Sequence, residues 1–302
     1  MSIGVLFMAY GSPRTIEEVE PYYTDIRGGR KPSAEALEHL KERYLRIGGT
    51  SPLEEVTTRQ AVATVDLLRR EGLDATAYVG MKHWHPFISD AVQQMHSDEV
   101  EVAIGLVLAP HFSKMSIGGY EERVLKAKAE IGAGFDFAMV DFWYDDQKFI
   151  DFVAANLRDT LNDWSANEDQ TRVFFTAHSL PERILASGDP YRDQLLDSSR
   201  LVAQVVGISN FEFAFQSASS TGEPWLGPDI LDRLESFKAE GGKRAVVAPI
   251  GFTADHLEVL FDVDVECAEK CGEIGLEFRR IPSPNDDPRF VGALAGIVRR
   301  AL

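Results

Sequence analysis

The chain has 302 residues, 44% of them hydrophobic, so it is long enough for two hydrophobic cores or one large one. Its net charge of −17 argues against a nucleic acid or an anionic membrane surface as partner. The longest apolar run, Val102 to Ala109, is much shorter than the ~20 residues of a membrane span. A strand pattern that begins at Ile3 leaves no room for a signal peptide, and we therefore expect a cytoplasmic protein without a membrane partner.

Short β-rich runs alternate with longer amphipathic stretches along the chain. The predicted strands, in chain order, are 3–9, 75–79, 102–109, 137–140, 173–177, 211–215, 245–249 and 276–280. The predicted helices between them include 33–47, 52–71, 87–95, 120–131, 147–162 and 191–206. This alternation predicts an α/β fold with parallel sheets, right-handed crossovers and helices on both faces.

Three segments of the first half recur in the second half in the same order. The pairs are 5–13 (VLFMAYGSP) with 173–181 (VFFTAHSLP), 86–90 (PFISD) with 224–229 (PWLGPD), and 107–112 (VLAPHF) with 246–252 (VVAPIGF). We therefore predict two similar Rossmann-like domains, residues 1–115 and 116–285, with a C-terminal helix at about 286–302 packing back on the first. The alternative is a chance similarity between apolar strands.

Ligands of parallel sheets bind beyond the carboxyl ends of the strands. Four residues lie just beyond the end of a predicted strand, namely Tyr10, His111, His178 and Thr253. If the two domains face one another, these residues line an active site in the cleft between them. No strand is followed by G-x-G-x-x-G or by a Walker loop, so a nucleotide-phosphate site is unsupported.

Glu258, Asp262 and Glu266 recur at intervals of four after the strand that ends near Gly251. In an α-helix a step of four drifts by only about 40°, so the three carboxylates would share one stripe. Like charges at this spacing cost a few tenths of a kcal/mol per pair, and this cost favours a bound cation. The alternative is a helix whose acids simply face water.

Charge is unevenly distributed along the chain. Residues 27–46 hold six basic side chains against three acids, whereas residues 255–273 hold seven acids against one lysine. The first segment could hold an anion and the second a cation, or both could be solvated helix faces. The two cysteines, Cys267 and Cys271, cannot supply the four ligands of a structural zinc site or an iron–sulfur cluster, and we expect ordinary reduced thiols.

Several motifs of the chain resemble the ferrochelatase family, whose members insert ferrous iron into porphyrins. They are MAYGSP at 8–13, YYTDIR at 22–27, IGGTSPL at 47–53, LAPHFS at 108–113, AHSLP at 177–181, PWLGPD at 224–229 and GFTADHLEVL at 251–260. The resemblance covers the whole chain, and it is closest to the soluble enzymes of Gram-positive bacteria that use coproporphyrin III. It implies chelatase-type domains, a monomer, and no cofactor beyond the substrate Fe²⁺.

The resemblance assigns His178 and Glu258 as the catalytic pair and as ligands of the incoming metal. Imidazole can accept a proton or bind a metal near neutral pH, and a carboxylate is an oxygen donor for Fe²⁺. Which of the two takes the pyrrole protons and which delivers iron stays open. Asp262 and Glu266 would be accessory metal residues that continue the stripe toward solvent. Tyr10 occupies the position from which coproporphyrin-type relatives offer an axial phenolate to the product iron.

The basic segment fits the propionates of a porphyrin, because arginine suits planar carboxylates. By resemblance, the substrate-binding residues are Tyr10, Arg27, Arg43, Tyr44, Ser51 and Tyr120. Gly28 stands where many relatives carry another basic residue. One contact with a propionate is therefore missing or supplied by another residue, for which Arg30 and Lys82 are candidates. Lys82 and His83 are also candidates for pocket lining, and Trp225 for either the porphyrin face or the domain core.

We therefore predict insertion of Fe²⁺ into coproporphyrin III to give coprohaem in haem biosynthesis. One alternative is a protoporphyrin IX ferrochelatase that makes protohaem directly, or a chelatase for another metal. A remoter alternative is a haem carrier that has lost catalysis, against which the presence of both His178 and Glu258 argues. A coprohaem decarboxylase is the natural recipient of the product.

Overall fold

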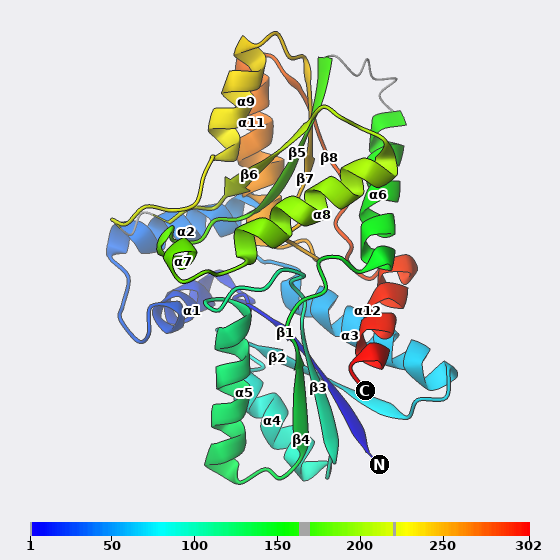
Figure 1. The fold of residues 1–302 in the computed structure, drawn as a ribbon. Helices are drawn as coiled ribbons and strands as arrows, with labels where there is room; N and C mark the ends of the chain where they lie inside the picture. The colour runs from blue at the N-terminus through cyan, green and yellow to red at the C-terminus, as the bar shows by residue number, and fades with distance from the viewer. Residues whose placement is uncertain (1, 163–169, 220–221) are drawn as a thin grey trace. The chain divides into compact units, whose positions relative to one another are not determined.

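The computed structural model describes residues 2–162, 170–219 and 222–302, and the chain divides into two compact units (Figure 1). The first unit contains Met1–Trp143, Ala254–His256 and Asn285–Leu302, and the second contains Tyr144–Thr253 and Leu257–Pro284. Each unit has its own four-stranded parallel sheet.

The sheet of the first unit has the order β2-β1-β3-β4. Its strands are β1 (Ile3–Ala9), β2 (Ala75–Met81), β3 (Val102–Val107) and β4 (Asp136–Val140). Its helices are η1 (Ile16–Glu18), α1 (Val19–Ile26), α2 (Ala34–Arg46), α3 (Leu53–Arg70), α4 (Ile88–Ser97), α5 (Ile117–Ile131) and α12 (Pro288–Arg300). All seven residues of β1 are buried, as expected for a central strand covered on both faces.

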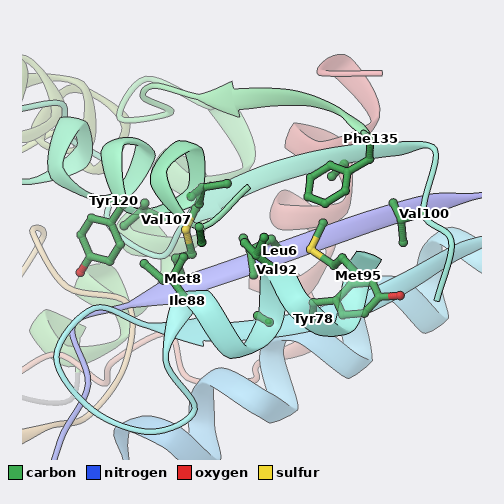
Figure 2. Close-up of a cluster of buried hydrophobic side chains, with 14 of the residues drawn as sticks. Leu6, Met8, Tyr78, Ile88, Val92, Met95, Val100, Val107, Tyr120 and Phe135 are labelled. Carbon is green, nitrogen blue, oxygen red and sulfur yellow. The ribbon is translucent and has the colours of Figure 1, made fainter. Parts of the chain in front are cut away.

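The first core lies between this sheet and helices α4 and α5 (Figure 2). Leu6 and Met8 point from β1 into it because alternate residues of a strand share a face. Ile88 and Val92 of α4 pack against them at helical spacing. Helix α3 covers the other face of the sheet, and α12 packs on α3.

The sheet of the second unit has the order β6-β5-β7-β8. Its strands are β5 (Thr171–His178), β6 (Phe211–Gln216), β7 (Arg244–Ala248) and β8 (Glu277–Arg280). Its helices are α6 (Gln147–Asn162), α7 (Arg183–Ala186), α8 (Tyr191–Val206), α9 (Ile230–Ala239), α10 (Leu257–Leu260), the π-helix η3 (Asp262–Cys267) and α11 (Ala268–Ile274). Phe174 of β5, Phe237 of α9 and Cys271 of α11 belong to the core on one face, while α6 and α8 pack together and contact β7 and β6.

The internal repeat predicted from sequence is confirmed by the strand order. Counted within each unit, both sheets run second-first-third-fourth. In each unit a residue at the end of the second strand donates its backbone N–H to the carbonyl of a proline in the loop that follows. Met81, the last residue of β2, donates to Pro86, and Phe215, the next-to-last residue of β6, donates to Pro228, both at 2.7 Å. The structural equivalent of Pro86 is therefore Pro228, four positions beyond the Pro224 with which sequence similarity had paired it.

All eight predicted strands are present, with ends within two residues of those expected. The predicted division at 115–116 differs from the observed one, which follows Trp143. The reason is that α5 packs against α4 and that β4 pairs with β3, so α5 and β4 both belong to the first unit. The C-terminal helix α12 also belongs to the first unit, where it packs on α3.

Among the described residues, no helix combines the length and the apolar character needed to cross a membrane.

Candidate active site

His178 and Glu258 are in contact in the second unit. His178 is the last residue of β5, Glu258 lies in the first turn of α10, and the distance from His178 Nδ1 to Glu258 Oε2 is 3.0 Å. About a third of each side chain is exposed, 33% and 28%, so the pair is open to a ligand yet partly shielded from water. A partly desolvated imidazole–carboxylate pair is suited to proton transfer.

The alternation of β5 explains why these two residues meet. Phe174 and His178 lie four residues apart on the strand and therefore share a face. Phe174 packs in the core formed with α9, η3 and α11. Helix α10 leads directly into η3, so it lies on the same side of the sheet as this core. His178 is consequently directed toward the start of α10.

Two further side chains hold the backbone of the pair. Gln216, the last residue of β6, is paired in register with His178, and its Nε2 donates to the backbone carbonyl of Glu258 at 2.8 Å. The hydroxyl of Tyr191 donates to the backbone carbonyl of His178 at 2.9 Å. Burial raises the pKa of Tyr191, and the charge of Glu258 adds to this, so the hydroxyl stays protonated and remains a donor.

The acidic stripe differs from the α-helical one predicted. The chain widens into a π-helix at Asp262–Cys267, where the N–H of Glu266 donates to the carbonyl of Phe261 at 2.9 Å, a step of five residues. Asp262 is 4% exposed and hydrogen-bonds the hydroxyl of Ser217, whereas Glu266 is exposed. The two therefore do not continue Glu258 as one solvent-facing row, and within the described ranges no cluster of three or more histidine, cysteine or acidic side chains has the geometry of a metal site.

Two ion pairs involve residues of the acidic segment 255–273. Arg280 binds Asp264 through two hydrogen bonds, at 2.6 and 2.8 Å. Lys270 contacts Glu235 of α9 at 2.6 Å. Asp264 is therefore compensated by an arginine, whereas the lysine of residues 255–273 is paired with an acid outside that segment.

Trp225 stands beside the candidate pair His178 and Glu258. Its ring is edge-on to the imidazole of His178, with centroids 6.1 Å apart and planes at 89°. Ser179 Oγ donates to the carbonyl of Leu226 at 2.7 Å and ties the Trp225 loop to the end of β5. The tryptophan ring thus lies against the candidate site.

Tyr10 occupies in the first unit the place that His178 has in the second, just where the first strand of the sheet ends. It is 41% exposed, and its ring lies 4.6 Å from that of His83, centroid to centroid. His83 is buried, and its Nδ1 lies 2.8 Å from Oδ2 of Asp25. The other two strand-end residues, His111 and Thr253, are buried at 2% and 3% exposure.

The predicted propionate-binding residues lie on α1, α2, α5 and the loop before α3. Arg27, at the end of α1, is exposed, and its guanidinium lies 5.7 Å from the Tyr23 ring centroid. Arg43 is half-buried on α2, and the backbone N–H of Leu53 donates to Ser51 Oγ at 3.4 Å. Arg30 donates to the carbonyl of Arg27 at 3.3 Å, so it lies beside the position that Gly28 leaves without a side chain.

Tyr44 and Tyr120 are buried, at 1% and 4% exposure. The Tyr44 hydroxyl lies 3.1 Å from Ser12 Oγ, which ties α2 to the chain just beyond Tyr10. The Lys82 ammonium lies 4.8 Å from the centroid of the Tyr120 ring. Burial, and secondarily Arg123, lowers the pKa of Lys82 to about 8.

Sequence reasoning did not single out Gln216, Tyr191 or Asp25. Gln216 directly follows the predicted strand 211–215, so the rule that ligands bind at carboxyl ends could have drawn attention to it. Asp25 lies inside the YYTDIR motif but was treated only as part of the resemblance. Tyr191 starts a helix and carries no local signal of its contact with His178.

The chain is similar to known proteins over its whole length. A sequence model of the family described as Ferrochelatase matches residues 2–302. The chain is 45% identical over 301 residues to the "Ferrochelatase" of Herpetosiphon aurantiacus, covering 97% of each chain. It is 44% identical over 304 residues to the "Coproporphyrin III ferrochelatase" of Geobacillus sp. strain WCH70, covering 99% of this chain and 98% of the relative.

Among solved structures, the sirohydrochlorin chelatase SirB from Bacillus subtilis subspecies spizizenii, in complex with cobalt, has the same fold at 10% identity. The TM-score is 0.60, and the match covers 100% of this chain and 95% of that one. That structure shows the fold, while the match of the family model over residues 2–302 and the 45% identity to the relative from Herpetosiphon aurantiacus show that the chain belongs to the ferrochelatase family.

Proposed function

We propose that this enzyme inserts Fe²⁺ into coproporphyrin III to give coprohaem, in haem biosynthesis. The observation that carries the proposal is the 3.0 Å contact between His178 and Glu258 in a chain 43–44% identical to several proteins named coproporphyrin III ferrochelatase. The proposal includes a monomeric, cytoplasmic enzyme without a cofactor, which passes its product to a coprohaem decarboxylase.

The contact between His178 and Glu258 accounts for the removal of pyrrole protons. Iron enters as a dication, so two pyrrole protons must leave for each iron inserted, and in this proposal His178 accepts them one at a time and releases each to solvent before the next. In this proposal the Glu258 carboxylate, 3.0 Å from Nδ1, favours a proton on that nitrogen, so that His178 presents the Nε2 lone pair as the base. The carboxylate then stabilises the imidazolium that forms, as a carboxylate does in other proton-transferring pairs.

The residues of the basic segment account for substrate recognition in this proposal. Coproporphyrin III carries four propionates, and Arg27 and Arg43, with Arg30 beside the gap at Gly28, offer guanidinium groups suited to carboxylates. Binding energy from the propionates, which are remote from the metal, can hold the ring in a puckered form that tilts a nitrogen lone pair toward the iron.

Protoporphyrin IX is the alternative substrate, because the relative from Herpetosiphon aurantiacus is named only Ferrochelatase. Anaerobic Fe²⁺ insertion with the two porphyrins in parallel separates the two possibilities. We expect a strong preference for coproporphyrin III that His178→Ala abolishes and that His96→Ala, an exposed histidine on α4, leaves unchanged. Preference for protoporphyrin IX would assign the alternative, and haem binding without insertion of either would indicate a carrier.

A further inference from the structure

Tyr10 and His83 are held side by side beyond the ends of β1 and β2. The backbone N–H of Lys82 donates to the carbonyl of Ala9, and that of His83 donates to the carbonyl of Tyr10, both at 2.9 Å. These bonds extend the pairing of the two strands past their last residues. The rings of Tyr10 and His83 then lie 4.6 Å apart between centroids, with their planes at 52°.

Asp25 of α1 determines which nitrogen of His83 carries the proton. A carboxylate can only accept, so the 2.8 Å contact with Oδ2 places a hydrogen on Nδ1. The contact with Asp25 therefore favours the tautomer with its proton on Nδ1 and a lone pair on Nε2.

The helix that carries Asp25 is fastened to the same strand ends. The hydroxyl of Tyr22 donates to the carbonyl of Gly11 at 3.1 Å, and Trp84 Nε1 donates to Glu18 at 2.9 Å. Gly11 has φ +97°, and a Cβ there would lie 2.9 Å from the backbone nitrogen of Trp84, so only glycine permits this approach. Asp25 therefore meets His83 from a rigid support.

We propose that Asp25 is a positioning residue for Tyr10 and acts through His83. The carboxylate fixes the tautomer and the plane of the imidazole, and the imidazole holds the exposed phenol ring of Tyr10 in one orientation at the edge of the sheet. This inference rests on the proposed role of Tyr10 as a ligand of the product iron. Groups that orient a metal ligand typically change metal affinity by 10- to 100-fold when removed, and we expect about 10-fold here because Asp25 acts through a ring contact.

The first test needs no porphyrin. Long-range ¹H–¹⁵N NMR spectra of histidine-labelled protein distinguish an Nδ1–H from an Nε2–H imidazole. We expect the Nδ1–H form for His83 in the parent and in Asp25→Asn, whose amide oxygen still accepts, and loss of that form in Asp25→Ala. Asp90→Asn is the matched control, because Asp90 lies 3.7 Å from the exposed His85. An unchanged His83 tautomer in Asp25→Ala would overturn the inference.

The second test uses ferric coproporphyrin III as the probe. We expect Asp25→Ala to weaken its binding about 10-fold and to shift its absorption spectrum toward that of Tyr10→Phe, with Asp25→Asn closer to the parent. The effect of Asp25→Ala should vanish in the Tyr10→Phe background. An equal loss in that background, in variants that melt at the parent temperature, would show that Asp25 acts by another route. Absence of iron insertion by the parent protein would count instead against the proposed function.

Discussion

Gly251 approaches β5 so closely that a Cβ atom at this position would lie 2.5 Å from the Cβ of Ala177. Its N–H donates to the carbonyl of Thr176 at 3.1 Å. Ala177 directly precedes His178 in β5, and Gly251 lies seven residues before Glu258. It therefore holds the segment that leads to α10 against the end of the strand that carries the histidine.

Replacement of Gly251 by alanine should disturb both stability and catalysis. The new methyl group cannot fit at 2.5 Å, so the backbone must move, at a cost of about 1–3 kcal/mol in the free energy of unfolding. Because the movement separates His178 from Glu258, we also expect kcat for iron insertion to fall. Gly272→Ala is the matched control, since a methyl group on Gly272 in α11 would meet no atom within 4 Å and alanine favours a helix. Equal effects of the two substitutions on unfolding and kcat would contradict this view of Gly251.

Asp262 and Glu266 should differ in their effects on stability and on the use of iron. Glu266 is exposed, so Glu266→Gln should leave the free energy of unfolding nearly unchanged and alter only the dependence of the rate on iron concentration. Asp262 is buried against Ser217, so Asp262→Asn should also lower stability, by about 1–3 kcal/mol. Thermal unfolding and iron titrations of both variants measure these effects. If the variant that carries both substitutions kept the parent's apparent affinity for iron, Asp262 and Glu266 would have no accessory role in metal delivery.

Tyr10→Phe should remove the phenol oxygen that we propose as a ligand of the product iron while keeping the ring that packs on His83. The absorption spectrum of bound ferric coproporphyrin should then shift, with little change in the melting temperature. Tyr144→Phe, in the second unit, serves as the control. A Tyr10→Phe spectrum that coincides with that of the parent would exclude axial ligation by this residue.

Buried His111 should make the protein less stable in acid. Burial lowers its pKa to about 3, against about 6.5 in an unfolded chain, so between these values the unfolded state binds more protons. Stability from this residue is therefore complete above about pH 6.5 and is lost as the pH falls toward 3, with a slope of up to about 1.4 kcal/mol per pH unit. Chemical denaturation of the parent and of His111→Asn across this range measures it. Parallel curves for the two proteins would show that His111 does not titrate on unfolding.

Cys267 and Cys271 should resist thiol reagents in the native protein. Both are fully buried, and burial raises the pKa of Cys271 to about 12 and that of Cys267 well above its usual value. Iodoacetamide should therefore modify neither thiol until denaturant is added, as read by mass spectrometry. Rapid alkylation of the folded protein would mean that η3 and α11 open readily.

The local patterns of the sequence were sufficient for the strands, most of the helices and the repeat. Alternation and helical periodicity depend on nearest neighbours, so β1 was predicted at its observed bounds and His178 at the end of β5. The same logic failed at η3, because the step of five residues that makes a π-helix leaves no local signature. It failed also at the domain boundary, because the pairing of β4 with β3 joins segments about 30 residues apart.

The sequence by itself determined the family, the order of the elements and the identities of the candidate catalytic residues, since these depend on residue type and local order. Only the tertiary structure decided that His178 Nδ1 lies 3.0 Å from Glu258, that Gln216 holds the backbone of Glu258, and that Asp25 binds His83. These contacts join residues about 40 to 80 positions apart. They form because parallel strands bring their carboxyl ends to one edge of a sheet, a relationship that depends on strand order and register.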